Sequence, residues 1–411
     1  MTKKTLLIIL IIIIFITLDV IFYVFFFQNR DSLKTQTQSP GPVFPISDNR
    51  SLEKEDVESD IPDNQGENSD NSIKLIGETT ENNLSFLSID NLSALSLSAF
   101  KIGTTTKIFI FDKPSGNIFE YTPSEGLNRL TNTTFPRVEE VVWGLDKNGL
   151  RLILRRSNSG LFNNTSGLIK LTKTGEIKEL ETNILSDNLL SFTVSPQKDK
   201  VFVINGRQGG IDGYIADFNL NNQKKIFSSP LSEWSICWPN PNYITFQTKP
   251  SFDVPGHLFF LNINNGSFEP ILRNIEGLLA LVGPNANKII YSRNTLDNIS
   301  TYLYDYKLDK SFRLSLSTFP EKCVWNEVGD MIFCAVPKNI TKANYPDDWY
   351  QGKVRFDDNL WVINASNGNV NLITDNQMLG DLINLKYNKD QNEIFAIDRN
   401  SKKIRIISLN N

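Results

Sequence analysis

Short apolar segments separated by polar turns recur from about residue 72 to the C-terminus. One pair of segments reads EVVWGLDKNGLRLIL, and similar pairs read FTVSPQKDKVFVI, SICWPNPNYITFQ, LALVGPNANKIIYS, CVWNEVGDMIFC and INLKYNKDQNEIFAI. Their first segments end near matching anchor positions, which are Trp143, Val194, Trp238, Val282, Trp325 and Tyr387. Short apolar runs bounded by Pro, Gly, Asn and Asp predict β-hairpins.

A second hairpin lies between successive anchor positions. Examples are NIFEYTPSEGLNRLT, GYIADFNLNNQKKIF and NLWVINASNGNVNLIT, whose turns contain residues that tolerate positive φ. Most anchors follow one another at about 44 residues. Two hairpins per period predict one four-stranded sheet per repeat, which is the unit of an all-β propeller. Counting the first hairpins, beginning with ALSLSAFKIGTTTKIFIFD, predicts seven blades, with six as the alternative.

The seventh repeat is incomplete at its C-terminal end. Its hairpin, Leu382 to Asp398, is followed by one further strand-like segment, KIRIISL. We expect Ser72 to Glu78, SIKLIGE, to supply the missing outer strand at the start of a propeller domain covering residues 73–411. Strands from both ends of the domain would then close the ring and remove its open edge.

The repeated segments resemble those of a known group of propellers. The first hairpins are similar to the W-S-P-D-G-x-x-I unit of TolB-like and WD-repeat-like propellers. The segment LWVINASNGNVNLIT resembles the L-W-V-x-D-x-x-T-G-x-x-x-x-L-T unit of the same group. The resemblance covers about Ser72 to the end and implies the propeller architecture, with protein binding in some members. The G-H…W-D pair and the S-x-D-x-G-x-T-W box are absent.

The N-terminal region follows a different pattern. Residues 5–27, TLLIILIIIIFITLDVIFYVFFF, are almost wholly apolar, and a helix of this length spans about 35 Å, enough for a bilayer core. Lys3 and Lys4 precede it, which predicts a short cytoplasmic tail at residues 1–4 and export of the rest. A retained signal-anchor is favoured over a cleaved signal peptide, because the first alanine is Ala94. Asp19 either has a functional partner or lies near the outer leaflet without a role.

Amino-acid composition predicts a linker and argues against several classes of function. Residues 28–72 are rich in Pro, Ser, Asn, Gln and acidic residues, which predicts a disordered acidic tether. The net charge of -4 does not indicate nucleic-acid binding. The chain has one His, three Cys and no CxxC motif, so no metal site or cofactor is expected.

The cysteines leave two interpretations open. With a turn at Val328-Gly329, Cys323 and Cys334 fall opposite one another on neighbouring strands, where a disulfide can form in an oxidising compartment. Alternatively, both act as small apolar core residues. Cys237 is expected to be an unpaired core residue.

One face of the predicted propeller carries the candidate binding residues. Long, variable loops join the second and third strands, and such loops on a rigid scaffold are typical recognition sites. A basic residue follows the second strand of each blade: Lys113, Arg155 with Arg156, Arg207, Lys249, Arg293, Lys338 and Arg399. This ring either attracts an anionic ligand or an acidic protein segment, or consists of solubilising residues that flank strands.

The longest loop contains YPDDWYQG, residues 345–352. Exposed Tyr345, Trp349 and Tyr350 would be typical interface anchors. In the alternative, the loop folds back onto its own blade and buries Trp349.

These patterns favour a non-catalytic binding or scaffold module outside the cytoplasm, with an envelope protein or an anionic surface polymer as partner. The alternative is a lyase or hydrolase with a site at the mouth of the central channel. Acidic residues at the starts of the innermost strands could ring that mouth: Glu139, Glu140, Glu233, Glu321 and Asp381. His257 is expected to be structural, and G-x-S-x-G, Walker, G-x-G-x-x-G and H-E-x-x-H motifs are absent.

Overall fold

The computed structural model describes residues 86–158, 161–171, 177–186, 188–295, 298–374 and 378–409. The predicted tail, membrane span and tether, residues 1–72, lie outside these ranges. Within the described ranges, no helix is both long enough and apolar enough to cross a bilayer.

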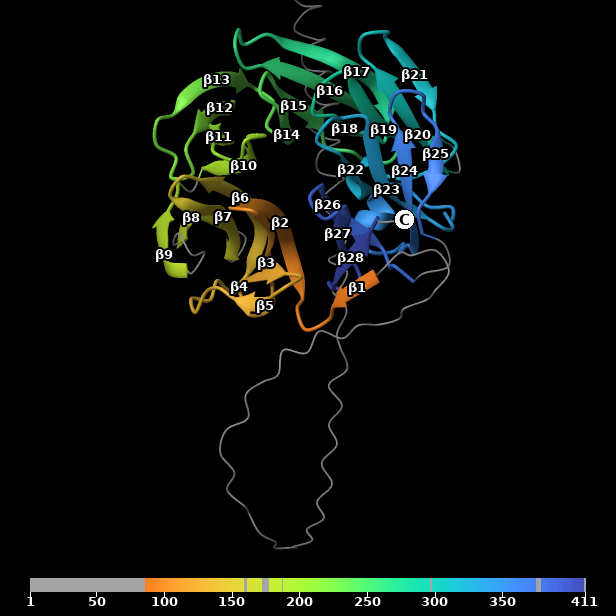
Figure 1. Ribbon diagram of the computed structural model, residues 1–411. Coiled ribbons are helices and arrows are strands. Elements are labelled where there is room, and N and C mark those ends of the chain that lie inside the picture. The colour runs from red at the N-terminus through yellow and green to blue at the C-terminus, as the bar shows by residue number, and fades with distance from the viewer. Residues whose placement is uncertain are drawn as a thin grey trace, which may run out of the picture. The chain divides into compact units, whose positions relative to one another are not determined.

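The described residues form seven four-stranded antiparallel sheets arranged as blades in a ring (Figure 1). The seven blades confirm the preferred repeat count and exclude six. Blades 1 to 6 are β2–β5, β6–β9, β10–β13, β14–β17, β18–β21 and β22–β25, and blade 7 is β26, β27, β28 and β1. Each anchor position identified from the sequence lies in, or at the end of, an innermost strand.

Each blade uses its strands in the same order from the ring centre outward. The innermost strands are β2 (Ala94–Ile102), β6 (Val138–Asp146), β10 (Leu189–Val194), β14 (Trp234–Asn240), β18 (Leu279–Val282), β22 (Cys323–Trp325) and β26 (Leu382–Asn388). The second strands are β3 (Thr105–Asp112), β7 (Gly149–Asn158), β11 (Val201–Arg207), β15 (Tyr243–Thr248), β19 (Lys288–Thr295), β23 (Met331–Pro337) and β27 (Glu393–Asp398).

The third strands are β4 (Ile118–Thr122), β8 (Leu161–Leu171), β12 (Gly210–Ala216), β16 (Pro255–Asn262), β20 (Asn298–Asp305), β24 (Asp358–Asn364) and β28 (Ile404–Ser408). The outermost strands are β5 (Gly126–Arg129), β9 (Ile177–Ile184), β13 (Lys224–Ser229), β17 (Phe268–Glu276), β21 (Lys310–Arg313), β25 (Val370–Leu372) and β1 (Phe86–Ile89). Two short helices lie in blade 6, the 3₁₀ helix η1 (Pro320–Lys322) and α2 (Asp347–Tyr350).

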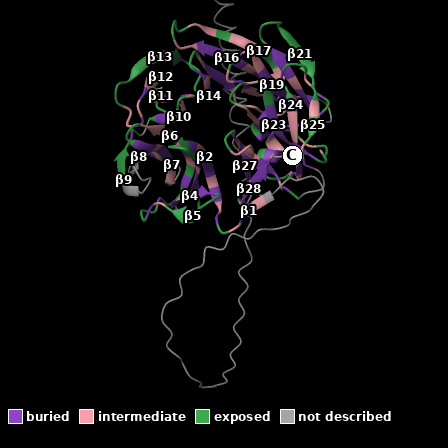
Figure 2. Cartoon of the chain, viewed as in Figure 1, coloured by how far each residue is buried: buried purple, intermediate pink, exposed green. Residues whose placement is uncertain are grey.

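The hydrophobic core is divided among the contacts between blades. Blades 1 and 2 share Phe109 and Leu152, for example, and blades 3 and 4 share Phe202 and Phe246. Every other pair of neighbouring blades, including blades 7 and 1, shares a cluster of the same kind. Buried positions therefore concentrate in the middle of the sheets, and exposed positions lie at loops and outer strands (Figure 2). A blade buries both of its faces only inside the complete ring.

The ring closes with a different segment from the one expected. β1 pairs with β28, with Ser88 opposite Arg405, and so completes blade 7. The expectation that Ser72 to Glu78 supplies this strand was wrong, and that segment lies outside the described residues. The physical reason is proximity, because β1 ends at Ile89 and β2 of the next blade begins at Ala94. A short connection thus joins the last blade directly to the first.

The two faces of the ring differ in their connections. Tight turns between first and second strands, and between third and fourth strands, lie on one face, which we call the turn face. The loops between second and third strands and the connections between blades lie on the other, which we call the loop face. Because each sheet is antiparallel, every second strand ends at the loop face.

Candidate functional site

All eight basic residues predicted from the sequence lie at the loop-face ends of second strands. Lys113, Lys249, Lys338 and Arg399 directly follow β3, β15, β23 and β27, while Arg155, Arg156, Arg207 and Arg293 lie near the ends of β7, β11 and β19. The structure therefore places these residues on one face, as the repeat pattern predicted.

Most of these cations are bound to acidic side chains. The pairs are Lys113–Glu139 at 3.1 Å, Lys249–Glu233 at 2.5 Å, Lys338–Asp357 at 2.6 Å and Arg207–Asp212 at 3.2 Å. Glu139 and Glu233 belong to the acidic residues that the sequence placed at the channel mouth. These two pairs join the two predicted rings of opposite charge, while Asp212 and Asp357 bind two further cations, so the loop face is not a free positive surface.

Arg155 makes the most enclosed of these pairs. Its guanidinium lies 2.8 Å from Glu140, and its side chain is only 12% exposed. The same group lies 4.6 Å from the centre of the Phe192 ring and donates a hydrogen bond to Asn164. Desolvation in the channel wall raises the pKa of Glu140, and the charge of Arg155 opposes this shift. Arg155 is therefore held by blade 3 as well as by its own blade.

Arg156 and Arg293 differ from the other basic residues. Neither makes an ion pair with any described residue, and the Nε of each is buried without a hydrogen-bond partner. Arg156 Nη2 donates to Thr165 Oγ1 at 3.4 Å. These two guanidinium groups are thus packed into the protein more than they are presented to a ligand.

The long loop of blade 6, residues 338–357, folds onto the ring, and we call it the strap. Tyr345 and Trp349 are 1% and 2% exposed, so neither is the surface anchor considered from the sequence. They pack with Phe319, Phe356 and Leu279, and the Trp349 ring stacks on Phe319 at 4.9 Å. Of the three aromatic residues, only Tyr350 keeps an exposed surface. Burying two large aromatic rings against apolar neighbours is more favourable than leaving them in water at a loop tip, and this explains why the loop folds back.

The strap reaches three other blades across the loop face. The Asp347 carboxylate accepts hydrogen bonds from Ser251 Oγ, at 3.2 Å, and from the backbone N–H of Phe252 in blade 4. The Tyr345 carbonyl accepts one from Asn294 of blade 5. Arg399 of blade 7 donates to the Tyr350 carbonyl at 3.0 Å and lies 4.8 Å from the Trp349 ring centre. The strap is therefore a fixed part of this face.

A buried charge cluster lies beneath the strap. Lys322 forms ion pairs with Asp358, at 2.8 Å, and with Asp381, and none of the three side chains is exposed. Asp381 also accepts a hydrogen bond from Trp349 Nε1 at 2.9 Å. Sequence reasoning identified Asp381 as a residue of the channel mouth but missed Lys322 and Asp358. The only sequence signal was the position of Lys322 beside Cys323, within an otherwise apolar strand start.

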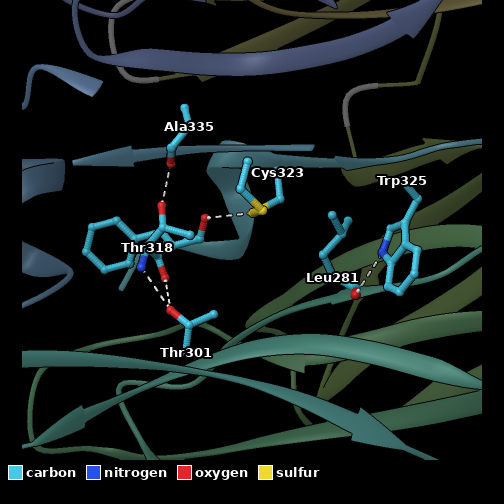
Figure 3. Close-up of a disulfide and its surroundings, with 8 residues drawn as sticks. Leu281, Thr301, Thr318, Cys323, Trp325 and Ala335 are labelled. Atoms are coloured by element: carbon cyan, nitrogen blue, oxygen red, sulfur yellow. Dashed lines mark hydrogen bonds between the residues drawn. A yellow bond between two sulfur atoms is a disulfide. The ribbon is translucent and has the colours of Figure 1, made fainter. Parts of the chain in front are cut away.

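Cys323 and Cys334 face each other across β22 and β23, the register expected from the sequence (Figure 3). Their sulfur atoms are 2.11 Å apart and form a disulfide, and both residues are buried. Nearby, Thr318 Oγ1 donates to the Ala335 carbonyl at 2.6 Å, and Trp325 Nε1 donates to the Leu281 carbonyl at 3.3 Å. The bridged sheet is thus attached to blade 5 on its inner side.

Five exposed apolar side chains lie at the loop-face ends of strands, or in a connection, of blades 2 to 4. Ile184 and Leu231 are 85% and 61% exposed; Ile184 is the last residue of β9, and Leu231 lies in the connection between blades 3 and 4. Phe162, Leu190 and Val254 are also exposed, and they lie at or beside the loop-face ends of β8, β10 and β16. Sequence reasoning did not identify these five residues, because single apolar residues in polar loops give no periodic signal.

The channel at the ring centre contains a cavity of about 330 Å³, bordered by β2, β6, β10 and β26. Glu139 and Glu140 lie at its loop-face end, and Lys198 and Lys386 lie towards the turn face. Cys237 was expected to be an unpaired core residue; it is unpaired, but it is exposed and does not belong to the core. Its thiol is close enough to both lysines that their charges act on its pKa. The alternation of the innermost strand β14 directs Cys237 into the channel and its neighbour Trp238 into the core.

The five acidic residues considered for catalysis do not converge. Glu139, Glu140 and Glu233 each bind a separate cation, Glu321 accepts a hydrogen bond from Tyr350, and Asp381 binds Lys322. Across the described part of the chain, no three His, Cys, Asp or Glu side chains gather as a metal-binding group. His257 lies beside Phe259, with 6.2 Å between ring centres.

No family model matches this chain, and no curated protein is similar to it. Solved structures share its fold. An oligogalacturonate lyase from Vibrio parahaemolyticus is 9% identical with a TM-score of 0.51, over 79% of this chain and 97% of that one. An oligogalacturonate lyase in complex with manganese is 10% identical with a TM-score of 0.50, over 77% and 96%. TolB from Acinetobacter baumannii is 10% identical with a TM-score of 0.36, over 79% of each chain. At these identities the likeness shows the propeller fold alone.

Proposed function

We propose that this chain is a membrane-anchored, extracytoplasmic propeller that docks a protein partner on the loop face of blades 2 to 4. The observation that carries the proposal is the combination of exposed apolar side chains with paired charges on that face. The partner surface has complementary apolar groups and few uncompensated charges. The role is that of a binding or scaffold module.

The chemistry of the face favours a protein over an anionic polymer. Exposed apolar residues surrounded by polar groups mark protein interaction surfaces. An anionic polymer would instead need free cations, and Lys113, Arg155 and Lys249 are each engaged by a carboxylate. Ion pairs at the rim add specificity and influence the association rate more than they add affinity.

Two features support a position outside the cytoplasm. The apolar run at residues 5–27 has the length of a membrane span and follows two lysines. The buried bridge between Cys323 and Cys334 is the kind of bond that persists in oxidising compartments. Anchoring would raise the local concentration of the propeller near partners at the membrane.

The same observations lead us to prefer binding over catalysis at the channel mouth. General acid–base or metal-assisted chemistry needs ionisable groups that converge on a reacting atom. The acidic residues at the mouth are instead occupied one by one by separate partners.

Cross-linking in the native cell with matched surface variants tests the docking face. Leu231→Asp with Val254→Asp places charges on the proposed face, and Leu308→Asp with Val328→Asp places the same charges on exposed positions of the turn face. We expect the first double variant to lose at least tenfold of the cross-linked partner, and the second to retain it. Equal capture by both variants, or equal loss, would contradict the proposed face.

A separate measurement tests the location. Protease added to intact cells with a permeable outer layer should digest an exported propeller, while a cytoplasmic control protein stays intact. Complete protection of the propeller until the membrane is lysed would overturn the extracytoplasmic assignment without bearing on the docking face.

A further inference from the structure

Two lysines inside the channel have no acidic partner. Lys198 lies in the turn between β10 and β11, Lys386 lies in β26, and both line the cavity of about 330 Å³. Neither ammonium group makes an ion pair or hydrogen bond with any residue in the described part of the chain. They belong to blades 3 and 7, so closure of the ring brings them together.

The other ionisable groups around the cavity do not balance these charges. Glu139 and Glu140 lie at the opposite end and are bound to Lys113 and Arg155. Desolvation inside the narrow channel raises the pKa of the Cys237 thiol, and the charges of Lys198 and Lys386 oppose this shift. Burial and, to a smaller extent, the charge of Lys198 together lower the pKa of Lys386 to about 8, partly opposed by Cys237. Both lysines thus face a positively charged, poorly hydrated space.

Neutral hydrogen-bonding side chains line the same cavity. Ser98, Thr193 and Asn384 border it, and their side chains make no hydrogen bond to the other described residues. Asn384 lies in an irregular stretch of β26, between Ile383 and Lys386, with φ of 54°. A bulge of this kind re-aims side chains and is common beside binding sites.

The backbone at Lys198 adds a second sign of a built site. Lys198 has φ of 64°, in the left-handed region that disfavours residues with a Cβ. The same turn occurs in blades 5 and 6, where Ala286 and Gly329 take the equivalent position. Blade 3 therefore has a lysine at a position where blades 5 and 6 have an alanine and a glycine.

We propose that the turn-face half of the channel binds a small anionic molecule, carrying a phosphate or carboxylate group, between Lys198 and Lys386. Two ammonium groups that approach each other without a carboxylate repel one another, and an anion between them removes that repulsion. Thr193 and Asn384 can complete the coordination of its oxygens. A volume of about 330 Å³ suits a small molecule and excludes a folded macromolecule. This site lies at the other end of the channel from the docking face and does not depend on it.

Calorimetric titration of the full chain with inorganic phosphate, and separately with succinate, tests this site at constant ionic strength. We expect one of the anions to bind at a single site, with affinity reduced at least tenfold in Lys198→Met and in Lys386→Met. Lys389→Met is the matched control, because Lys389 is exposed, lies next to β26 and has the same charge. Its affinity should equal that of the unchanged protein.

Acetylation of the unchanged protein gives an independent readout. Limited reaction followed by mass spectrometry should show that the bound anion slows modification of Lys198 and Lys386 but not of Lys389. Binding of phosphate alone or of succinate alone would identify the oxygen-bearing group and support the proposal. Absence of binding by both anions, equal weakening in all three variants, or protection of Lys389 to the same degree would overturn it.

Discussion

The Lys322 ammonium lies 2.8 Å from the Asp358 carboxylate, and neither side chain has any exposed surface. The same ammonium binds Asp381, so one cation serves two buried carboxylates. Asp381 also accepts hydrogen bonds from Trp349 and from the backbone of Phe356, whereas Asp358 Oδ1 is buried without a partner. Burial raises the pKa of Asp358 to about 6, partly opposed by Lys322. Asp358 therefore holds a proton more readily than an ordinary aspartate does.

Asp358→Asn should remove a pH dependence of stability. The ordinary pKa of an aspartate is 3.8, and burial raises the pKa of Asp358 to about 6 in the folded protein. Between these values the folded state binds more protons, so this site lowers the free energy of unfolding by roughly 2 kcal/mol as the pH rises from about 4 to 6, and by about 3 kcal/mol over its whole titration range. Relative to the unchanged protein, the variant should gain stability over that interval, measured by urea unfolding.

Asp381→Asn is the control for this prediction. It removes the charge of the carboxylate that Lys322, Trp349 and Phe356 all contact, so it should destabilise the protein at every pH in the series by about 3 kcal/mol or more. A constant stability difference between the Asp358 variant and the unchanged protein from pH 4 to 6 would show that Asp358 does not titrate in this range.

Replacing both cysteines of the bridge with alanine should lower the free energy of unfolding by about 2–3 kcal/mol. The bridge closes a short loop, with a sequence separation of 11, and restricts the unfolded chain accordingly. Urea unfolding with and without a reducing agent measures the effect. The reducing agent should destabilise the unchanged protein and leave the double variant unaffected, although Cys237 remains. If the reducing agent also destabilised the double variant, the loss of stability would come from a group other than this disulfide.

Arg155→Met and Lys249→Met should differ in cost although each breaks one ion pair. The Arg155 side chain is 12% exposed, whereas the Lys249 and Glu233 side chains are 63% and 72% exposed. An exposed pair contributes less than about 1 kcal/mol, whereas an enclosed pair with an aromatic contact contributes about 1–3 kcal/mol. Thermal unfolding of both variants checks the order. Equal losses would mean that Arg155 is as well solvated as Lys249.

Removal of β1 should open the ring. A chain lacking residues 1–89 exposes the edge of β28 and loses the contacts of Ile89 with the cluster between blades 7 and 1. A chain lacking residues 1–85 keeps both and serves as the control. We expect the shorter chain to unfold at lower temperature and to aggregate through its free edge. Identical melting and solubility of the two chains would refute closure by β1.

Much of the fold could be predicted because its information is local. Alternation of apolar residues and the turn residues within each period identified seven first hairpins and six second hairpins, and the register of Cys323 against Cys334 followed from a single turn. The positions of the basic residues on one face followed from the same register. The closing strand could not be found this way, because Phe86–Ile89 is a short segment whose partner, β28, lies more than 300 residues away along the chain.

The functional surfaces depended on contacts between distant blades. Asp347 binds Ser251 from 96 positions away, and Lys322 binds Asp381 from 59 positions away. No pattern along the chain records such pairs, because hydrophobic periodicity specifies which face of a strand is buried and not which residue lies opposite on another blade.

The amino-acid sequence by itself favoured seven blades over six and determined the direction of each strand and the face to which each loop belongs, since these follow from side-chain alternation and turn geometry within one repeat. Only the tertiary structure decided that the basic residues are neutralised, that Trp349 is buried and that Lys198 meets Lys386 in the channel. Closing the ring sets the distances between charges on different blades, and these distances decide which charges are satisfied and which remain free to bind a ligand.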